Sequence, residues 1–193
     1  MNGPTNAGIL AFMKEDYPGA DELYDVVNDD GEIIGQATRK EVHTNPDLIH
    51  RAVHILIFRS SGKLVMQKRV KTKDVAPGKW DTSVGGHVDA GEDLITAAKR
   101  ETEEEMGITG IELVHLYDFK YRSEKESEDV RTYRAVYDGP LSPNDFEIET
   151  IKEWSPEEID RAIGTGAFTK NFEQDWKEYR AREASAKDEK DRP

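Results

Sequence analysis

The 193-residue chain contains no cysteine. This absence excludes a disulfide scaffold, a thiol nucleophile and a zinc site built on cysteine ligands. Long hydrophobic runs are absent too. The longest run near the N-terminus, residues 7–13, is too short to cross a bilayer and lacks the preceding basic residues of a signal peptide. We therefore expect a cytoplasmic protein with no membrane partner.

Basic residues are the minority, with 27 Lys and Arg against 40 Asp and Glu and a net charge of −13. Proteins that coat nucleic acid present a basic surface, so nucleic acid is not an expected partner. The length favours one domain. We expect an N-terminal extension over residues 1–20, the domain over residues 21–180, and a charged C-terminal tail over residues 181–193 that frays.

Strands dominate the expected secondary structure. Alternating and apolar runs predict strands over residues 23–28, 32–38, 50–59, 63–69, 81–84, 111–121 and 130–137, and Asp29-Asp30-Gly31 predicts a hairpin between the first two. A helix is expected over residues 94–106. Another starts at Ser155-Pro156, and an apolar stripe of Phe172, Trp176 and Tyr179 marks a last one. This mixture predicts an α/β sandwich.

The helix over residues 94–106 has an unusual face. Leu94, Ala97 and Ala98 share one side, and an ordinary amphipathic helix would continue that stripe with apolar residues. The sequence instead places three carboxylates there, those of Glu101, Glu104 and Glu105. We therefore expect all three to turn toward the sheet, with Arg100 pairing with Glu104 four residues on.

Buried like charges are costly unless something compensates them. A hard divalent cation such as Mg²⁺, which takes oxygen ligands and substrate phosphates, is the simplest compensation. A solvated acidic face is the alternative interpretation.

The spacing around this helix resembles a known motif. Gly86-x5-Glu92-x7-Arg100-Glu101-Thr102-x-Glu104-Glu105-x-Gly107-Ile108 matches all seven fixed positions of the Nudix box. One apolar position of the box is Thr102 here. The resemblance implies an α/β/α sandwich with a mixed β-sheet. It also implies hydrolysis of a diphosphate in a small, nucleotide-like substrate, with Mg²⁺ or Mn²⁺ as cofactor and a homodimer as a common assembly.

The resemblance also implies residue roles. Glu101, Glu104 and Glu105 would be catalytic metal ligands, with the carbonyl of Gly85 as a further ligand, and Glu104 or Glu105 would take the proton from the attacking water. Structural support of the site falls to Gly86, Glu92 and Arg100.

A basic stretch precedes the motif. Residues 63–80 hold six basic side chains and one acidic side chain, whereas residues 89–105 hold two basic and seven acidic ones. A basic loop beside an acidic metal helix suits a polyanionic substrate. Lys68, Arg69 and Lys73 are the candidates for phosphate contact, with a solvated loop as the alternative. Trp80 is a candidate either for stacking on a base or for the core.

A second resemblance covers residues 24–154. The segments His43-Thr44, Leu48-Ile49-His50-Arg51-Ala52, Lys68-Arg69 and Pro77 to His87 look like type 1 isopentenyl-diphosphate isomerase. In that family histidines matching His43, His50 and His87 help to bind a metal, so these three form a candidate second metal site. A glutamate pair completes the site, and we find no counterpart for it near Arg131 to Arg134.

The isomerases carry a cysteine where this chain has Gly85, and that thiol does proton chemistry on the alkene. Its absence favours a hydrolase of the isomerase-like branch over an isomerase. A non-catalytic Nudix-like ligand-binding module is the third hypothesis, although such modules usually have a damaged box. His54 and His115 match nothing and are assigned no role.

Overall fold

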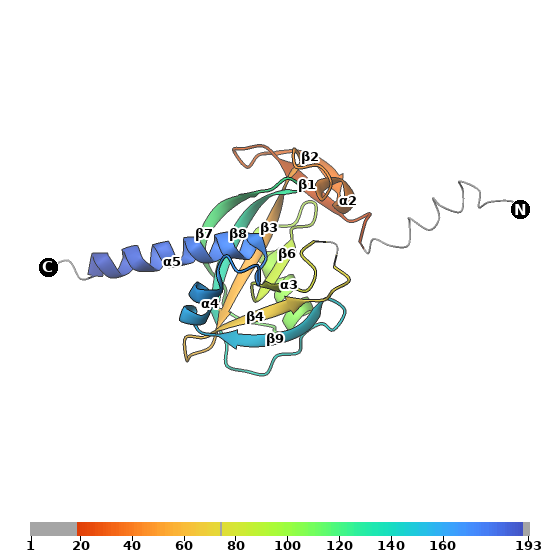
Figure 1. Ribbon diagram of the computed structural model, residues 1–193. Coiled ribbons are helices and arrows are strands. Elements are labelled where there is room, and N and C mark those ends of the chain that lie inside the picture. The colour runs from red at the N-terminus through yellow and green to blue at the C-terminus, as the bar shows by residue number, and fades with distance from the viewer. Residues whose placement is uncertain (1–18, 74, 191–193) are drawn as a thin grey trace, which may run out of the picture.

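The computed structural model describes residues 19–73 and 75–190, with side chains described to residue 186. The described part of the chain starts with the β1–β2 hairpin and then forms a sheet around one long strand, β3 (Figure 1). The strands are β1 (Leu23–Val27), β2 (Ile33–Thr38), β3 (Ile49–Phe58), β4 (Leu64–Arg69), β5 (Trp80–Asp81), β6 (Val84–His87), β7 (Val114–Arg122), β8 (Ser127–Val136) and β9 (Ile148–Trp154). The helices are α2 (Arg39–Val42), α3 (Leu94–Met106), α4 (Pro156–Ala162) and α5 (Lys170–Lys190).

Strand β3 is the centre of the sheet. Along one edge it pairs with β8, in parallel, over its whole length from Ile49↔Ser127 to Phe58↔Val136. It also pairs antiparallel with β1, β6 and β4 in succession. Strand β7 then joins β8, and β9 joins β4, both antiparallel. The sheet is therefore mixed, as expected.

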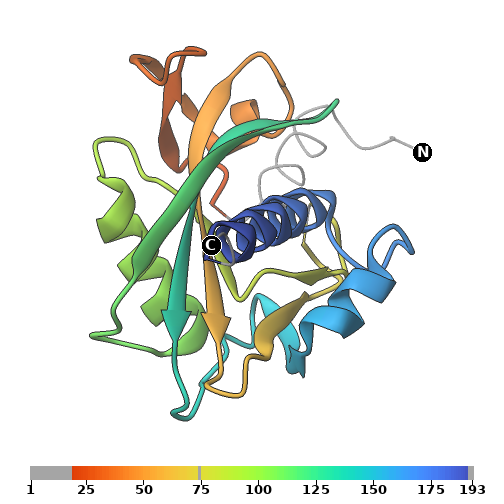
Figure 2. The ribbon, with the colours of Figure 1, turned by 90° about the vertical axis from the view of Figure 1, so that its left-hand side faces the viewer.

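Alternation along β3 defines the two faces of the sheet. Val53, Ile55 and Ile57 belong to a core cluster that includes Ala97 and Ala98 of α3. Leu56 and Phe58, on the other face, pack with Phe172 and Trp176 of α5. Helices α3 and α5 thus cover opposite faces of the sheet (Figure 2). This confirms the α/β/α sandwich.

Local signals fixed the ends of the predicted helices. Asp93 caps α3 by accepting the N–H groups of Ile95 and Thr96, and Gly107 ends it with a φ of +67°, a left-handed conformation that suits glycine. The capping box predicted at α4 is present: the Ser155 hydroxyl accepts the N–H of Glu158, and the Glu158 carboxylate accepts the N–H of Ser155.

The structure differs from the sequence-based expectation at several elements. Two short strands, β5 and β6, replace the single strand expected over residues 81–84. Strand β9 was not expected, because its residues are mostly charged or exposed and only Ile148 is fully buried. The tail does not fray directly after residue 180, since α5 continues to Lys190, supported by ion pairs such as Arg182–Glu178 at 2.6 Å.

The apolar run at residues 7–13 lies outside the described residues. Within the described part of the chain, no helix combines the length and the apolar character needed to cross a bilayer.

Candidate functional site

The three candidate glutamates of α3 do not share one environment. Glu105 is buried, and its Oε2 accepts hydrogen bonds from Gln67 Nε2 at 2.8 Å and from the N–H of Gly85 at 3.2 Å. The Glu101 side chain is 15% exposed, whereas that of Glu104 is 55% exposed. The expectation that all three turn toward the sheet is therefore wrong for Glu104, which lies about 100° round the helix from Glu105.

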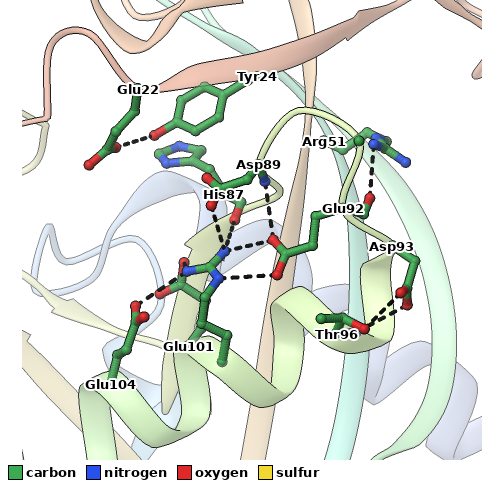
Figure 3. A network of polar contacts seen from close by, with 12 residues as sticks. Glu22, Tyr24, Arg51, His87, Asp89, Glu92, Asp93, Thr96, Glu101 and Glu104 are labelled. Carbon is green, nitrogen blue, oxygen red and sulfur yellow. Dashed lines mark hydrogen bonds and ion pairs between the residues drawn. The ribbon is translucent and has the colours of Figure 1, made fainter.

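Arg100 of α3 makes hydrogen bonds to the loop before the helix, to β6 and to its own helix. Figure 3 shows the carboxylates of Glu92, Glu101 and Glu104 converging on one point. Arg100 donates to both carboxylate oxygens of Glu92, at 3.1 and 2.9 Å, and to the carbonyl of His87 at 3.1 Å. Its remaining amino group donates to Glu101 at 2.7 Å and to Glu104 at 3.3 Å. One guanidinium group thus sets the position of two candidate metal ligands relative to β6.

Gly86 lies against the Glu101 carboxylate. A Cβ atom added at residue 86 would fall 2.0 Å from the Glu101 Cδ, a distance that no side chain tolerates. Glycine is therefore required at this position for Glu101 to reach β6.

Gly86→Ala is expected to push Glu101 aside and to weaken Mg²⁺ binding by about 10-fold to 100-fold, the range for changes that misplace a metal ligand. Isothermal titration with Mg²⁺ measures this affinity. The matched control is Gly35→Ala in β2, where an added Cβ meets nothing within 4 Å. Equal Mg²⁺ affinity in the two variants would contradict this account of Gly86.

Burial gives the two inner glutamates unusual proton affinities. Burial, reinforced by the charges of Glu101 and Glu147, raises the pKa of Glu105 to about 8. Burial also raises the pKa of Glu101 to about 7, against the opposing effect of Arg100. One buried and one partly buried carboxylate that repel each other and offer only oxygen atoms fit a hard divalent cation such as Mg²⁺.

These pKa values predict a pH-dependent stability for the metal-free protein. An unfolded glutamate titrates near pH 4.3. Between there and pH 8, folded Glu105 keeps a proton that the unfolded chain has released, so the unfolding free energy falls as pH rises. From pH 5 to pH 8.5 the wild type should lose on the order of 3 kcal/mol more than Glu105→Gln. Urea unfolding in EDTA measures this, and parallel pH profiles would refute it.

The candidate phosphate-binding side chains of the basic stretch are paired with acidic residues in the structure. Lys68 pairs with Glu149 at 2.9 Å, Arg69 pairs with Asp81 at 3.2 Å, and Lys73 pairs with Glu147. Of these three cations only Arg69 borders the large cavity described below. Trp80 is half-buried and packs edge-on against Trp154, with ring centroids 5.5 Å apart, so it belongs to the core.

The three candidate histidine side chains lie close together in the structure. His43 follows α2, His50 lies in β3 and His87 ends β6, and one ring nitrogen from each lies within 4.8 Å of the others. The Nε2 atoms of His43 and His87 are 3.2 Å apart.

A glutamate pair adjoins these histidines, which corrects the sequence analysis. Glu128 Oε1 lies 3.6 Å from Nε2 of both His50 and His87, and Glu126 Oε2 lies 4.0 Å from His43 Nε2. We had looked near Arg131 to Arg134, but the parallel register of β8 places Glu128 directly beside His50. Two glutamates spaced by one residue at the start of a strand were the signal that would have found them.

The donor chemistry of this cluster fits a transition metal. His50 Nε2 is buried and has no hydrogen-bond partner among the described residues. Burial, together with His87, lowers the pKa of His50 to about 3, so its ring is neutral, the form that binds metal. Three imidazoles and two carboxylates suit Mn²⁺ or Zn²⁺ better than Mg²⁺.

A cavity of about 1180 Å³ lies beside this cluster. The cavity is lined by residues of this histidine–glutamate cluster, of β6 and of α5, including His43, His87, Glu126, Glu128, Gly85 and Lys170. Gly85 connects the two regions, because its N–H bonds Glu105 while its residue borders the cavity.

Comparisons with known proteins agree with this geometry. The NUDIX domain family matches residues 48–175. The chain is 35% identical over 142 residues to YfcD of Escherichia coli (strain K12), named an uncharacterised Nudix hydrolase, covering 72% of this chain and 76% of YfcD. It is 34% identical over 153 residues to a protein of Clavibacter sepedonicus named isopentenyl-diphosphate Delta-isomerase, covering 76% and 80%.

Among solved structures, DR0079 from Deinococcus radiodurans superposes with a TM-score of 0.73 at 25% identity, covering 81% of this chain and 98% of that one. The fold, the arrangement around α3 and the matched span lead to one conclusion: this chain belongs to the Nudix family.

Proposed function

We propose that the protein is a divalent-metal-dependent hydrolase that cleaves a diphosphate linkage in a small, nucleotide-like substrate. The observation that carries this proposal is the complete glutamate set, with Glu101 and Glu105 held against Gly85 and Gly86.

Each residue of the site has a distinct role in this proposal. A Mg²⁺ or Mn²⁺ ion held by Glu101, Glu105 and the Gly85 carbonyl would neutralise the diphosphate and acidify the attacking water. Glu104 completes the ligand set from the exposed rim of the helix. Arg100 and Glu92 keep the carboxylates in place, and Arg69, which faces the cavity, contacts a phosphate.

The test is a panel of nucleoside diphosphate derivatives incubated with Mg²⁺ or Mn²⁺ while released phosphate or monophosphate is measured. We expect metal-dependent release from at least one compound, and loss of that release in the Glu101→Gln, Glu105→Gln double variant. Release that persists in EDTA, or in the double variant, would overturn the assignment.

Isomerisation of isopentenyl diphosphate is the second candidate. The cluster of His43, His50, His87, Glu126 and Glu128 favours it, and so do relatives named as isomerases. Gly85 and the lack of cysteine oppose it. Formation of dimethylallyl diphosphate with Mn²⁺ present would establish this activity, and no product at high enzyme concentration would dispose of it.

A third candidate function, the non-catalytic binding module, and two further expected properties each have their own test. A non-catalytic binding module would show Mn²⁺ binding without turnover on any diphosphate. A homodimer would show twice the chain mass in light scattering. A cytoplasmic location, with no nucleic acid or membrane partner, is tested by cell fractionation.

A further inference from the structure

The side chain of Asn171, in the first turn of α5, reaches the histidine–glutamate cluster from the wall of the cavity. Its Nδ2 donates a hydrogen bond to Oε2 of Glu128, which lies in β8. Both residues border the cavity, and Glu128 is only 6% exposed. Asn171 belongs neither to the glutamate site on α3 nor to the ligand atoms of the cluster, so it contacts the cluster through Glu128.

The two carboxylate oxygens of Glu128 have different partners. Oε2 accepts the hydrogen bond from Asn171, whereas Oε1 lies 3.6 Å from Nε2 of both His50 and His87. A hydrogen bond to one oxygen of a carboxylate fixes its plane and leaves the other oxygen to bind a metal ion. Glu128 is thereby presented to the histidines as a one-oxygen ligand.

The chemistry of the amide determines which end of Asn171 faces Glu128. A carboxylate ligand accepts hydrogen bonds, so the NH₂ end of the amide has to be the one that meets it. The other end, Oδ1, is buried and has no hydrogen-bond partner among the described residues. A buried amide oxygen without a partner costs free energy. The contact with Glu128 therefore explains the conformation of this side chain better than the stability of α5 does.

The start of α5 is anchored on both sides of Asn171. Thr169, which precedes the helix, donates from its Oγ1 to Oδ1 of Asp81, in β5, at 2.9 Å. One turn beyond Asn171, Asp175 accepts a hydrogen bond from the hydroxyl of Thr132, in β8, at 2.9 Å. These contacts hold the helix backbone against the sheet, so that the amide approaches β8 in a single geometry.

A carboxylate that offers one oxygen suits a transition metal. Mn²⁺ and Zn²⁺ bind imidazole, whereas Ca²⁺ collects more oxygen ligands and often takes both oxygens of one carboxylate. Because Asn171 occupies Oε2 of Glu128, the second mode of binding is disfavoured. The hydrogen bond thus agrees with the metal class that the three histidines favour.

We infer that Asn171 is a positioning residue for a metal ion bound by the histidine–glutamate cluster, and that it acts by holding Glu128 with Oε1 toward the histidines. This inference goes beyond the proposed hydrolysis, because it concerns metal binding and holds for either candidate reaction. Its test therefore succeeds or fails independently of the hydrolase proposal.

The direct test is a titration of the whole chain with Co²⁺, which substitutes for Zn²⁺ or Mn²⁺ and whose visible absorption depends on its ligands and geometry. Excess Mg²⁺ is added to fill the glutamate site on α3. We expect a saturable visible band in the wild type from Co²⁺ at the cluster. The lack of such a band would overturn the inference, because a cluster that binds no transition metal has no ligand to position.

Asn171→Leu keeps nearly the same side-chain volume and removes the donor. It is expected to weaken Co²⁺ binding by about 10-fold to 100-fold, the range for losing the hydrogen-bond partner of a metal ligand, and to shift the visible band. Asn171→Gln, which keeps the donor on a longer side chain, should restore part of the affinity. Wild-type affinity and band in Asn171→Leu, or an equal loss in both variants, would contradict the assignment.

Gln174→Leu is the matched control, with circular dichroism of each metal-free protein as the measure of folding. Gln174 also lies on α5 and borders the cavity, but its amide donates to the carbonyl of Lys120, at 2.9 Å, and not to the cluster. It should bind Co²⁺ as the wild type does. Equal weakening in Asn171→Leu and Gln174→Leu would show a general effect of the cavity wall and would overturn the role of Asn171.

Discussion

Glu105→Gln is expected to reduce metal-dependent diphosphate hydrolysis by about 10³-fold, because the substitution removes the proposed metal ligand and proton acceptor while preserving the shape of the side chain. The glutamine oxygen can still accept the hydrogen bonds that Gln67 and Gly85 donate to Glu105. The fold should therefore survive. Steady-state kinetics on the substrate found in the panel, together with circular dichroism, measure both effects.

Glu103→Gln is the matched control for this experiment. Glu103 lies on the same helix, two residues away, and its side chain is exposed. It should keep wild-type activity, since it reaches neither the sheet nor the cavity. A loss of less than about tenfold in Glu105→Gln would show that another group takes the proton and that Glu105 acts mainly in packing.

Asp175→Ala is expected to cost about 3–5 kcal/mol of unfolding free energy, because it removes the acceptor shared by several buried polar groups. The substitution leaves His54 Nδ1 and the hydroxyls of Tyr117 and Thr132 buried without the acceptor they share. Urea unfolding monitored by tryptophan fluorescence measures the loss.

Asp118→Ala provides the comparison, because Asp118 also pairs with a histidine but is 54% exposed. Its loss should cost less than about 1 kcal/mol. If the two variants unfold at the same urea concentration, burial does not set the contribution of Asp175 to stability. The hydrogen bonds that Asp175 accepts would then add little to the unfolding free energy.

Local sequence patterns were sufficient to predict helix α3. The helix expected over residues 94–106 has the bounds observed, and in the structure Asp93 and Gly107 set its two ends locally. The hairpin around Asp29 to Gly31 and the start of α4 were predicted for similar reasons, since turn and cap chemistry is confined to a few neighbouring residues.

Pairings between distant residues could not be predicted in this way. Glu128 joins His50 only through the parallel register of β8 on β3, and Asp175 joins His54 across 121 residues. Sequence periodicity states which face a residue occupies on its own element, not which element covers that face. The exposed position of Glu104 was missed because charged residues do not mark the edge of a buried stripe.

Strand β6 also restricts where the sequence of this protein can accept insertions or deletions. Successive residues of a strand point to opposite faces. Gly86 faces Glu101 and α3, whereas Gly85 and His87 face His54 and the histidine cluster. A slip of one residue in the pairing of β6 with β3 would exchange these faces and dismantle both sites in a single event. Insertions or deletions should therefore be excluded from residues 84–87 and accommodated in the flanking loops, whatever substrate the protein acts on.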